Sequence, residues 1–189
     1  VSGGSKNVAS GFASSVTGGG GVDPRDASVS FGNTASGDFS SVTGGSNNIA
    51  SGRAATVSGG GGRDVENPEE PFGSTASGDF SSVSGGTWNR AEGKNASVSG
   101  GTNNTARGGS STISGGERNL ASGDQASVLG GWGNQAGGNN DSVSGGARNI
   151  ASGGSSTISG GRNCEIYSEY SWAIGGMDPA SGCVTTNSQ

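Results

Sequence analysis

A repeat of 15 residues is the feature of this sequence that most restricts its possible folds. Units of the type Ser-Val-Ser-Gly-Gly each place one β-branched residue between small polar ones. These residues are Val1, Val16, Val42, Val57, Val83, Val98, Ile113, Val128, Val143, Ile158 and Ile174. Successive members are 15 residues apart, except for two steps of 26 and a last step of 16. Because 26 is one period plus 11 residues, we expect an insertion in each long step, over about residues 20–31 and 61–72.

Composition alone would be typical of a disordered chain. Gly and Ser make up 77 of the 189 residues, whereas Leu, Ile, Val and Phe number only 26, which is too few for an ordinary globular core. Flexible Gly/Ser linkers have no fixed period, however. A fixed short period is the signature of a solenoid, in which each repeat buries its core by stacking on its neighbours. We therefore predict an all-β, parallel β-solenoid (a β-roll or β-helix) with coils of about 15 residues.

Each coil is long enough for two short strands and two tight turns. In residues 96–110, alternation points Val98 and Ala96 inward and Ser97 and Ser99 outward, and Ala106 is the small inward residue of the second strand. Gly at fixed offsets supplies the turns. We expect a thin core of one Val or Ile, one Ala and one Ser or Ala in each coil, in a solenoid of residues 1–163.

Asparagine also recurs in phase with the repeat. Its positions are Asn33, Asn48, Asn89, Asn104, Asn119, Asn134 and Asn149, with Ser74 at the one gap. Asn tolerates the left-handed backbone conformation, and identical Asn residues in successive coils can hydrogen-bond as a ladder. We expect a structural role for this row rather than a binding role.

The pattern breaks near the C-terminus, where we expect a cap over residues 164–189. A solenoid end needs a cap because it exposes a sheet edge and the core. Cys164 and Cys183 are the only cysteines of the chain, and a disulfide between them would close this cap and contribute roughly 3 kcal/mol. Two free thiols are the alternative. A disulfide would also indicate an oxidising, extracytoplasmic location, so we expect a secreted protein.

Several classes of function are excluded or disfavoured by what the chain lacks. It has no His, which excludes His-based catalysis and His metal sites, and no catalytic constellation is recognisable, so we expect no enzyme and no cofactor. A net charge of −5 disfavours nucleic acid as a partner, and no apolar run is long enough for membrane insertion.

The second insertion contains Asp64, Glu66, Glu69 and Glu70, whose oxygens suit Ca²⁺. Their spacing matches no metal-binding loop, however, and we expect a solvated loop without metal.

The outward residues on either side of the buried Val or Ile are the candidate binding site. They are Ser15 and Thr17, Ser41 and Thr43, Thr56 and Ser58, Ser82 and Ser84, Ser97 and Ser99, Thr112 and Ser114, Ser127 (with Leu129), Ser142 and Ser144, and Thr157 and Ser159. Coils stacked about 4.8 Å apart would align them as two parallel files of hydroxyls, ~50 Å long and free of charge. Exposed sheets normally carry charges that prevent association. Such a face suits an ordered water layer that merges with ice, or packing against an identical face.

The second strand of each coil would present another broad face. Its outward residues are Val8, Thr34, Ile49, Thr75, Arg90, Thr105, Leu120, Gln135 and Ile150. They are mixed in size and include a charge, so this face is less regular. Its aliphatic residues would suit a subunit interface or, if the alternation is reversed, part of the core.

Two families share this kind of repeat. The unit Ser-Val-Ser-Gly-Gly-x-x-Asn-x-Ala-Ser-Gly resembles the head repeats of trimeric autotransporter adhesins, and Trp172-Ala-Ile-Gly175 is closest to their Ala-Ile-Gly signature. That resemblance implies a cell-surface module and a homotrimer. The period of 15, where those heads favour 14, and the paired cysteines differ from that family. The repeat is also similar to secreted ice-binding (antifreeze) proteins of cold-adapted algae and microbes. That resemblance implies a monomer whose partner is ice or ordered water, bound by the outward Ser/Thr files.

Overall fold

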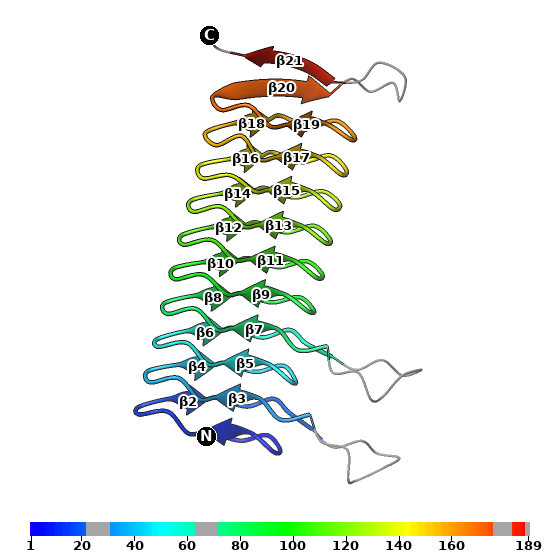
Figure 1. Ribbon diagram of the computed structural model, residues 1–189. Coiled ribbons are helices and arrows are strands. Elements are labelled where there is room, and N and C mark those ends of the chain that lie inside the picture. The colour runs from blue at the N-terminus through cyan, green and yellow to red at the C-terminus, as the bar shows by residue number, and fades with distance from the viewer. Residues whose placement is uncertain (22–30, 63–71, 176–182, 188–189) are drawn as a thin grey trace.

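The protein is a parallel β-solenoid, as predicted (Figure 1). The computed structural model describes residues 1–21, 31–62, 72–175 and 183–187, and these form two long sheets. The first sheet consists of β1 (Val8–Ala9), β3 (Thr34–Ala35), β5 (Ile49–Ala50), β7 (Thr75–Ala76), β9 (Arg90–Ala91), β11 (Thr105–Ala106), β13 (Leu120–Ala121), β15 (Gln135–Ala136), β17 (Ile150–Ala151) and β19 (Glu165–Ile166). The second consists of β2 (Ser15–Val16), β4 (Ser41–Val42), β6 (Thr56–Val57), β8 (Ser82–Val83), β10 (Ser97–Val98), β12 (Thr112–Ile113), β14 (Ser127–Val128), β16 (Ser142–Val143), β18 (Thr157–Ile158), β20 (Ser171–Gly175) and β21 (Cys183–Asn187).

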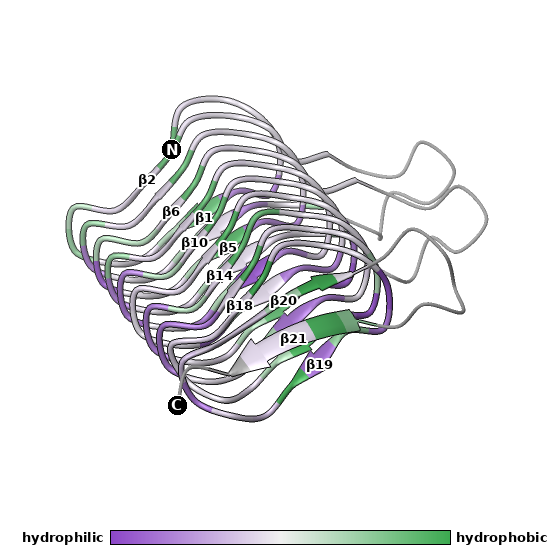
Figure 2. Ribbon diagram, turned by 90° about the horizontal axis from the view of Figure 1, so that it is seen from above, coloured by the Kyte–Doolittle hydropathy of each residue, from purple (hydrophilic) through white to green (hydrophobic). Residues whose placement is uncertain are grey.

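The strands pair in register with the sequence repeat. Val98 lies beside Ile113 and Ala106 beside Ala121, each one period along the chain. The register also holds across the insertions, since Val8 pairs with Thr34. The expected loops at residues 20–31 and 61–72 therefore leave the stacking unchanged, although residues 22–30 and 63–71, with the acidic residues considered for Ca²⁺, lie outside the described residues. Viewed along the axis, the coils are successive copies of one outline (Figure 2).

A third row of parallel contacts connects six successive coils, in the turn that leads from the second sheet to the first. Isolated backbone bridges connect Thr87, Thr102, Glu117, Trp132, Ala147 and Arg162, one from each successive coil. We call this the third row. The sequence pattern predicts two strands per coil and does not reveal this row, because its residues share no side-chain type.

The core is as thin as expected. Val98, Ala96 and Ala106 are all at most 1% exposed, and their equivalents in the other coils form one continuous hydrophobic cluster. Small side chains let the sheets approach closely, so that one Val or Ile per coil fills the interior. This confirms the predicted alternation of inward and outward residues.

The last coil departs from the prediction. We expected Ile174 to be the buried residue, but Ala173 lies beside Ile158 and Ile174 is 45% exposed. The strand keeps the 15-residue register, and a slip of one residue would have turned every side chain to the opposite face. The volume lost at Ala173 is recovered in the other sheet, where Ile166 is buried in place of the Ala of earlier coils. In this coil the large core residue lies in the first sheet and the small one in the second, which is the reverse of the earlier coils.

Glycine is required where coils contact each other through their backbones. A Cβ atom built on Gly108 would overlap the carbonyl of Gly123 in the next coil. Gly116 has the same constraint against Gly131 and also has a φ of +84°, which favours glycine. The high Gly content thus follows from close stacking at two corners of each coil.

The recurring Asn residues form the expected ladder inside the solenoid. Asn104 is fully buried; its Oδ1 accepts from the backbone N–H of Asn119 at 3.0 Å, and its Nδ2 donates to the carbonyls of Gly100 (3.0 Å) and Gly116 (2.9 Å). The ladder Asn residues do not use the left-handed conformation that Asn tolerates. The residue before them does so, as at Asn103 with a φ of 57°. The side-chain amide of the ladder Asn satisfies one buried backbone N–H and two part-buried backbone carbonyls.

Buried hydroxyls alternate with alanines along one corner of the core. Ser40 and Ser81 are 1% exposed, and within the described part of the chain their Oγ atoms have no hydrogen-bond partner. Ala55 and Ala96 occupy the same position in neighbouring coils and are equally buried.

We expect Ser81→Ala to stabilise the protein by about 1 kcal/mol, because it removes a buried hydroxyl that has lost its hydration without gaining a partner. Urea denaturation followed by circular dichroism measures the change. Ser111→Ala is the matched control, since the Ser111 hydroxyl donates to Gly108 at 2.7 Å, and it should destabilise. Equal losses in both variants would contradict this explanation.

A disulfide between Cys164 and Cys183 closes the C-terminal end, as predicted. Cys164 occupies the ladder position of Asn in the last coil, where its backbone N–H donates to Asn149 Oδ1 at 3.0 Å. β21 pairs antiparallel with β20, so the bond ties the final strand to the coil beneath it (Figure 1). None of the described segments forms a helix that could cross a membrane.

We expect Cys183→Ser to lower the free energy of unfolding by roughly 3 kcal/mol, because the disulfide restricts the unfolded chain. Denaturation of the oxidised protein, the variant and the reduced protein provides the measurement. The variant and the reduced protein should agree with each other. A variant as stable as the oxidised protein would show that β21 is held by its hydrogen bonds alone.

Candidate functional site

The second sheet presents the predicted hydroxyl residues on its outer surface, which we call the hydroxyl face. The first file precedes the buried Val or Ile and consists of Ser15, Ser41, Thr56, Ser82, Ser97, Thr112, Ser127, Ser142 and Thr157. The second file follows it and consists of Thr17, Thr43, Ser58, Ser84, Ser99, Ser114, Leu129, Ser144 and Ser159. Every member of the second file is exposed, whereas most of the first file is half-buried. The second file is therefore the more solvent-accessible of the two.

Hydroxyls of the first file hydrogen-bond to each other along the solenoid axis. Ser15 donates to Ser41 at 3.2 Å, Ser82 to Ser97 at 3.2 Å, and Thr112 to Ser127 at 3.3 Å. These bonds restrict the hydroxyl rotors of the first file. The sequence repeat predicts that the hydroxyls align but does not predict that they contact each other, because that depends on the spacing between coils.

The hydroxyl face ends in apolar residues near the C-terminus. Trp172 and Ile174 continue the two files on β20 and are 40% and 45% exposed. The indole N–H of Trp172 donates to Ser159 Oγ at 2.9 Å, which joins the aromatic ring to the last hydroxyl of the second file. Leu129 is 53% exposed and is the one aliphatic residue within the files themselves.

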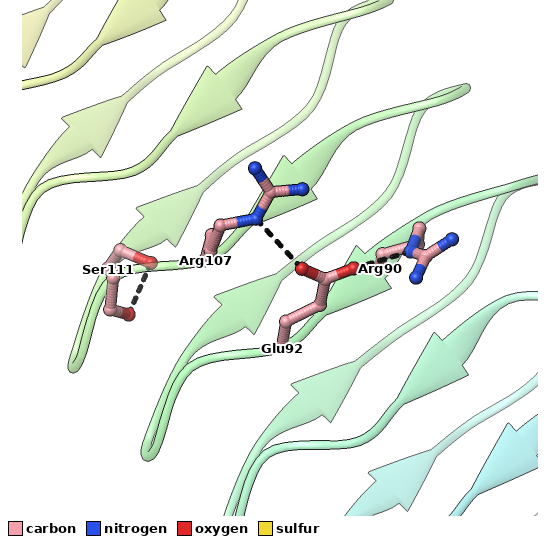
Figure 3. A network of polar contacts seen from close by, with 5 residues as sticks. Arg90, Glu92, Arg107 and Ser111 are labelled. Carbon is pink, nitrogen blue, oxygen red and sulfur yellow. Dashed lines mark hydrogen bonds and ion pairs between the residues drawn. The ribbon is translucent and has the colours of Figure 1, made fainter.

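The first sheet carries charges on its outer face. Glu92 lies between two arginines: its Oε1 accepts from Arg90 Nε at 2.6 Å and its Oε2 from Arg107 Nε at 2.9 Å (Figure 3). Burial acts to raise the pKa of Glu92, but the hydrogen bonds and positive charges of Arg107 and Arg90 outweigh it, and the pKa of this carboxyl is lowered. The 15-residue step from Glu92 to Arg107 is the sequence signal by which this cluster could have been found.

The other outward residues of the first sheet are irregular. Val8 and Ile49 are exposed, Leu120 and Ile150 are half-buried, and Thr34, Thr75, Thr105 and Gln135 lie between them. They point outward as predicted and do not belong to the core.

The third row is also charged, through Glu117 and Arg162, and Arg148 lies over the ring of Trp132 at 4.6 Å from its centroid. Of the two sheets and the third row in the described part of the chain, the hydroxyl face alone has no Asp, Glu, Lys or Arg among its outward residues.

The hydroxyl face has two regular spacings. Along the solenoid axis, equivalent residues of successive coils are about 4.8 Å apart. Along each strand, the two files are two residues apart, which is about 6.6 Å. Hydroxyls both donate and accept hydrogen bonds, so such an array can contact water at evenly spaced points. No metal cluster of three or more His, Cys, Asp or Glu side chains occurs among the described residues.

No protein-family model matches the chain, and a search of curated proteins finds no significant match.

Proposed function

We propose that this protein binds ice through the hydroxyl face. The observation that carries the proposal is a regular double file of small hydroxyls without a charged residue, on a molecule whose first sheet and third row both carry charges. A charged side chain orders water around itself, whereas evenly spaced hydroxyls bond water at fixed points. Ice offers a repeating lattice to which such water can join. The mechanism needs neither a catalytic group nor a cofactor.

Rigidity supports the proposal, because an adsorbing surface must hold its spacing before it meets the ice. Backbone hydrogen bonds connect each coil to the next, as from Ser97 N–H to the Ser111 carbonyl at 2.9 Å, and the buried Asn ladder adds side-chain bonds. The bonds within the first file hold its hydroxyls in position. We also propose that the protein is secreted, because disulfides form and persist in oxidising compartments outside the cytoplasm.

Thermal hysteresis and ice-crystal shaping test the proposal directly. We expect a gap between the melting and freezing points that grows with protein concentration, together with faceted crystals. If the solution freezes at its melting point and the ice crystals stay unshaped at millimolar protein, ice binding is refuted.

The oligomeric state separates ice binding from the adhesin-like alternative. We expect a monomer, with a mass near 18.0 kDa by light scattering, because a trimer built through the outer surface of the first sheet would bury the charges of Arg90 and Arg107. A stable homotrimer would favour the adhesin-like cell-surface module instead.

A further inference from the structure

A hollow of about 380 Å³ lies beside the end of the second insertion, where the third row meets the first sheet. Gly73, Thr75, Trp88, Arg90 and Asn103 line it. Gly73, Trp88 and Asn103 occupy equivalent positions in three successive coils. The indole of Trp88 therefore lies between Gly73, which has no side chain, and the smaller side chain of Asn103. Gly73 is required there, since a Cβ atom would overlap the carbonyl of Asn47.

Trp88 is an unusual residue at this position. Its φ of 56° is shared by residues at the same position in other coils, such as Asn47, Asn103 and Arg118, so Trp88 differs from them in its aromatic side chain and not in its backbone. Its ring packs edge-to-face against Phe72, with 4.5 Å between centroids, yet the residue remains 38% exposed. The indole is therefore a pre-positioned wall of the hollow.

Arg90 supplies a fixed cation at the same place. The Nε of Arg90 donates to Glu92, and the terminal nitrogens of the guanidinium point away from that carboxylate (Figure 3). Glu92 is shared with Arg107, so the three side chains together carry one net positive charge. The five lining residues include no carboxylate.

We propose that this hollow binds a sugar ring that carries a carboxylate, such as one uronate unit of an acidic polysaccharide. The apolar face of a sugar ring suits an indole. The carboxylate suits the terminal nitrogens of Arg90, which donate in a planar fork. The hydroxyl of Thr75 and the amide of Asn103 can bond the ring hydroxyls. The volume lies at the lower end of the range for small-ligand sites. The proposal does not depend on ice binding, because the hollow is not part of the hydroxyl face.

The first insertion provides a natural comparison within the chain. There, Gly32 and Thr34 are equivalent to Gly73 and Thr75, but Asn47 and Ile49 stand where the second has Trp88 and Arg90. Asn47 adopts the same conformation as Trp88, with a φ of 57°. Trp88→Asn combined with Arg90→Ile thus places in the hollow two residues that this fold already accommodates.

Calorimetric titration of the full chain with a galacturonate trisaccharide tests the proposal, with neutral galactotriose as the comparison. We expect one site with a Kd on the order of 1 mM for the acidic trisaccharide. The neutral sugar should bind about tenfold more weakly, and the double variant should lose at least about tenfold in affinity for the acidic one. Trp132→Ala, which changes a tryptophan outside the hollow, should bind like the parent protein.

Three results would overturn the proposal: no binding of the acidic trisaccharide at about 10 mM, equal binding of the neutral one, or a double variant that binds like the parent. Circular dichroism establishes that each variant is folded. Thermal hysteresis of the double variant should match the parent.

Discussion

Thr112→Tyr is expected to remove most of the thermal hysteresis measured at equal protein concentration. Thr112 is exposed in the middle of the first file, and a tyrosine there would project above its neighbours and hold ice away from several coils at once. The measurement is the freezing-point gap in parallel with ice-crystal shape.

Thr105→Tyr is the matched control for this prediction. Thr105 lies in the same coil on the first sheet, where no role in ice binding is proposed, so its substitution should leave thermal hysteresis unchanged. Both variants should unfold at the same urea concentration as the parent. Full activity in Thr112→Tyr, or equal losses in both variants, would exclude the hydroxyl face as the ice-binding surface.

Asn104→Ala is expected to destabilise the protein by about 3 kcal/mol. It removes three side-chain hydrogen bonds, which leaves the buried N–H of Asn119 without its acceptor and the part-buried carbonyls of Gly100 and Gly116 with one donor fewer. Urea denaturation measures the decrease in the free energy of unfolding. Hydrogen exchange should show it concentrated in adjacent coils, since each repeat contacts only its neighbours.

Asn104→Ser calibrates this prediction, because the fold already contains a serine in the ladder. Ser74 donates to the carbonyl of Gly86 at 3.4 Å, and its backbone N–H donates to Asn48 Oδ1 at 2.9 Å. The serine variant should therefore be intermediate in stability between Asn104→Ala and the parent. If the alanine variant loses less than about 1 kcal/mol, backbone stacking alone supports the coils.

Much of the fold could be predicted from residues within one coil. The 15-residue spacing predicts the solenoid, and alternation around Val98 correctly places Ala96 inside and Ser99 outside. The disulfide follows from the only two cysteines of the chain. The period and the alternation repeat so regularly that any unit reveals them, and two cysteines allow only one pairing within the chain. Ile174 misled the prediction because a β-branched residue resembles core, whereas the register had already assigned the inner position to Ala173.

Contacts between coils were harder to predict. Glu92 joins Arg90 and Arg107 because residues one period apart become neighbours, and the third row has no common side chain to reveal it. The hollow at Trp88 likewise needs three coils in register.

The sequence by itself determined the period, the inward and outward positions of each coil and the alignment of the hydroxyls, because these follow from the alternation of side chains along a strand. Only the tertiary structure decided the bonds along the first file, the exact partners of the buried Asn amides and the register of the last coil. The physical reason is that these features depend mainly on contacts between neighbouring coils, whose distance is set by the stacking of complete coils.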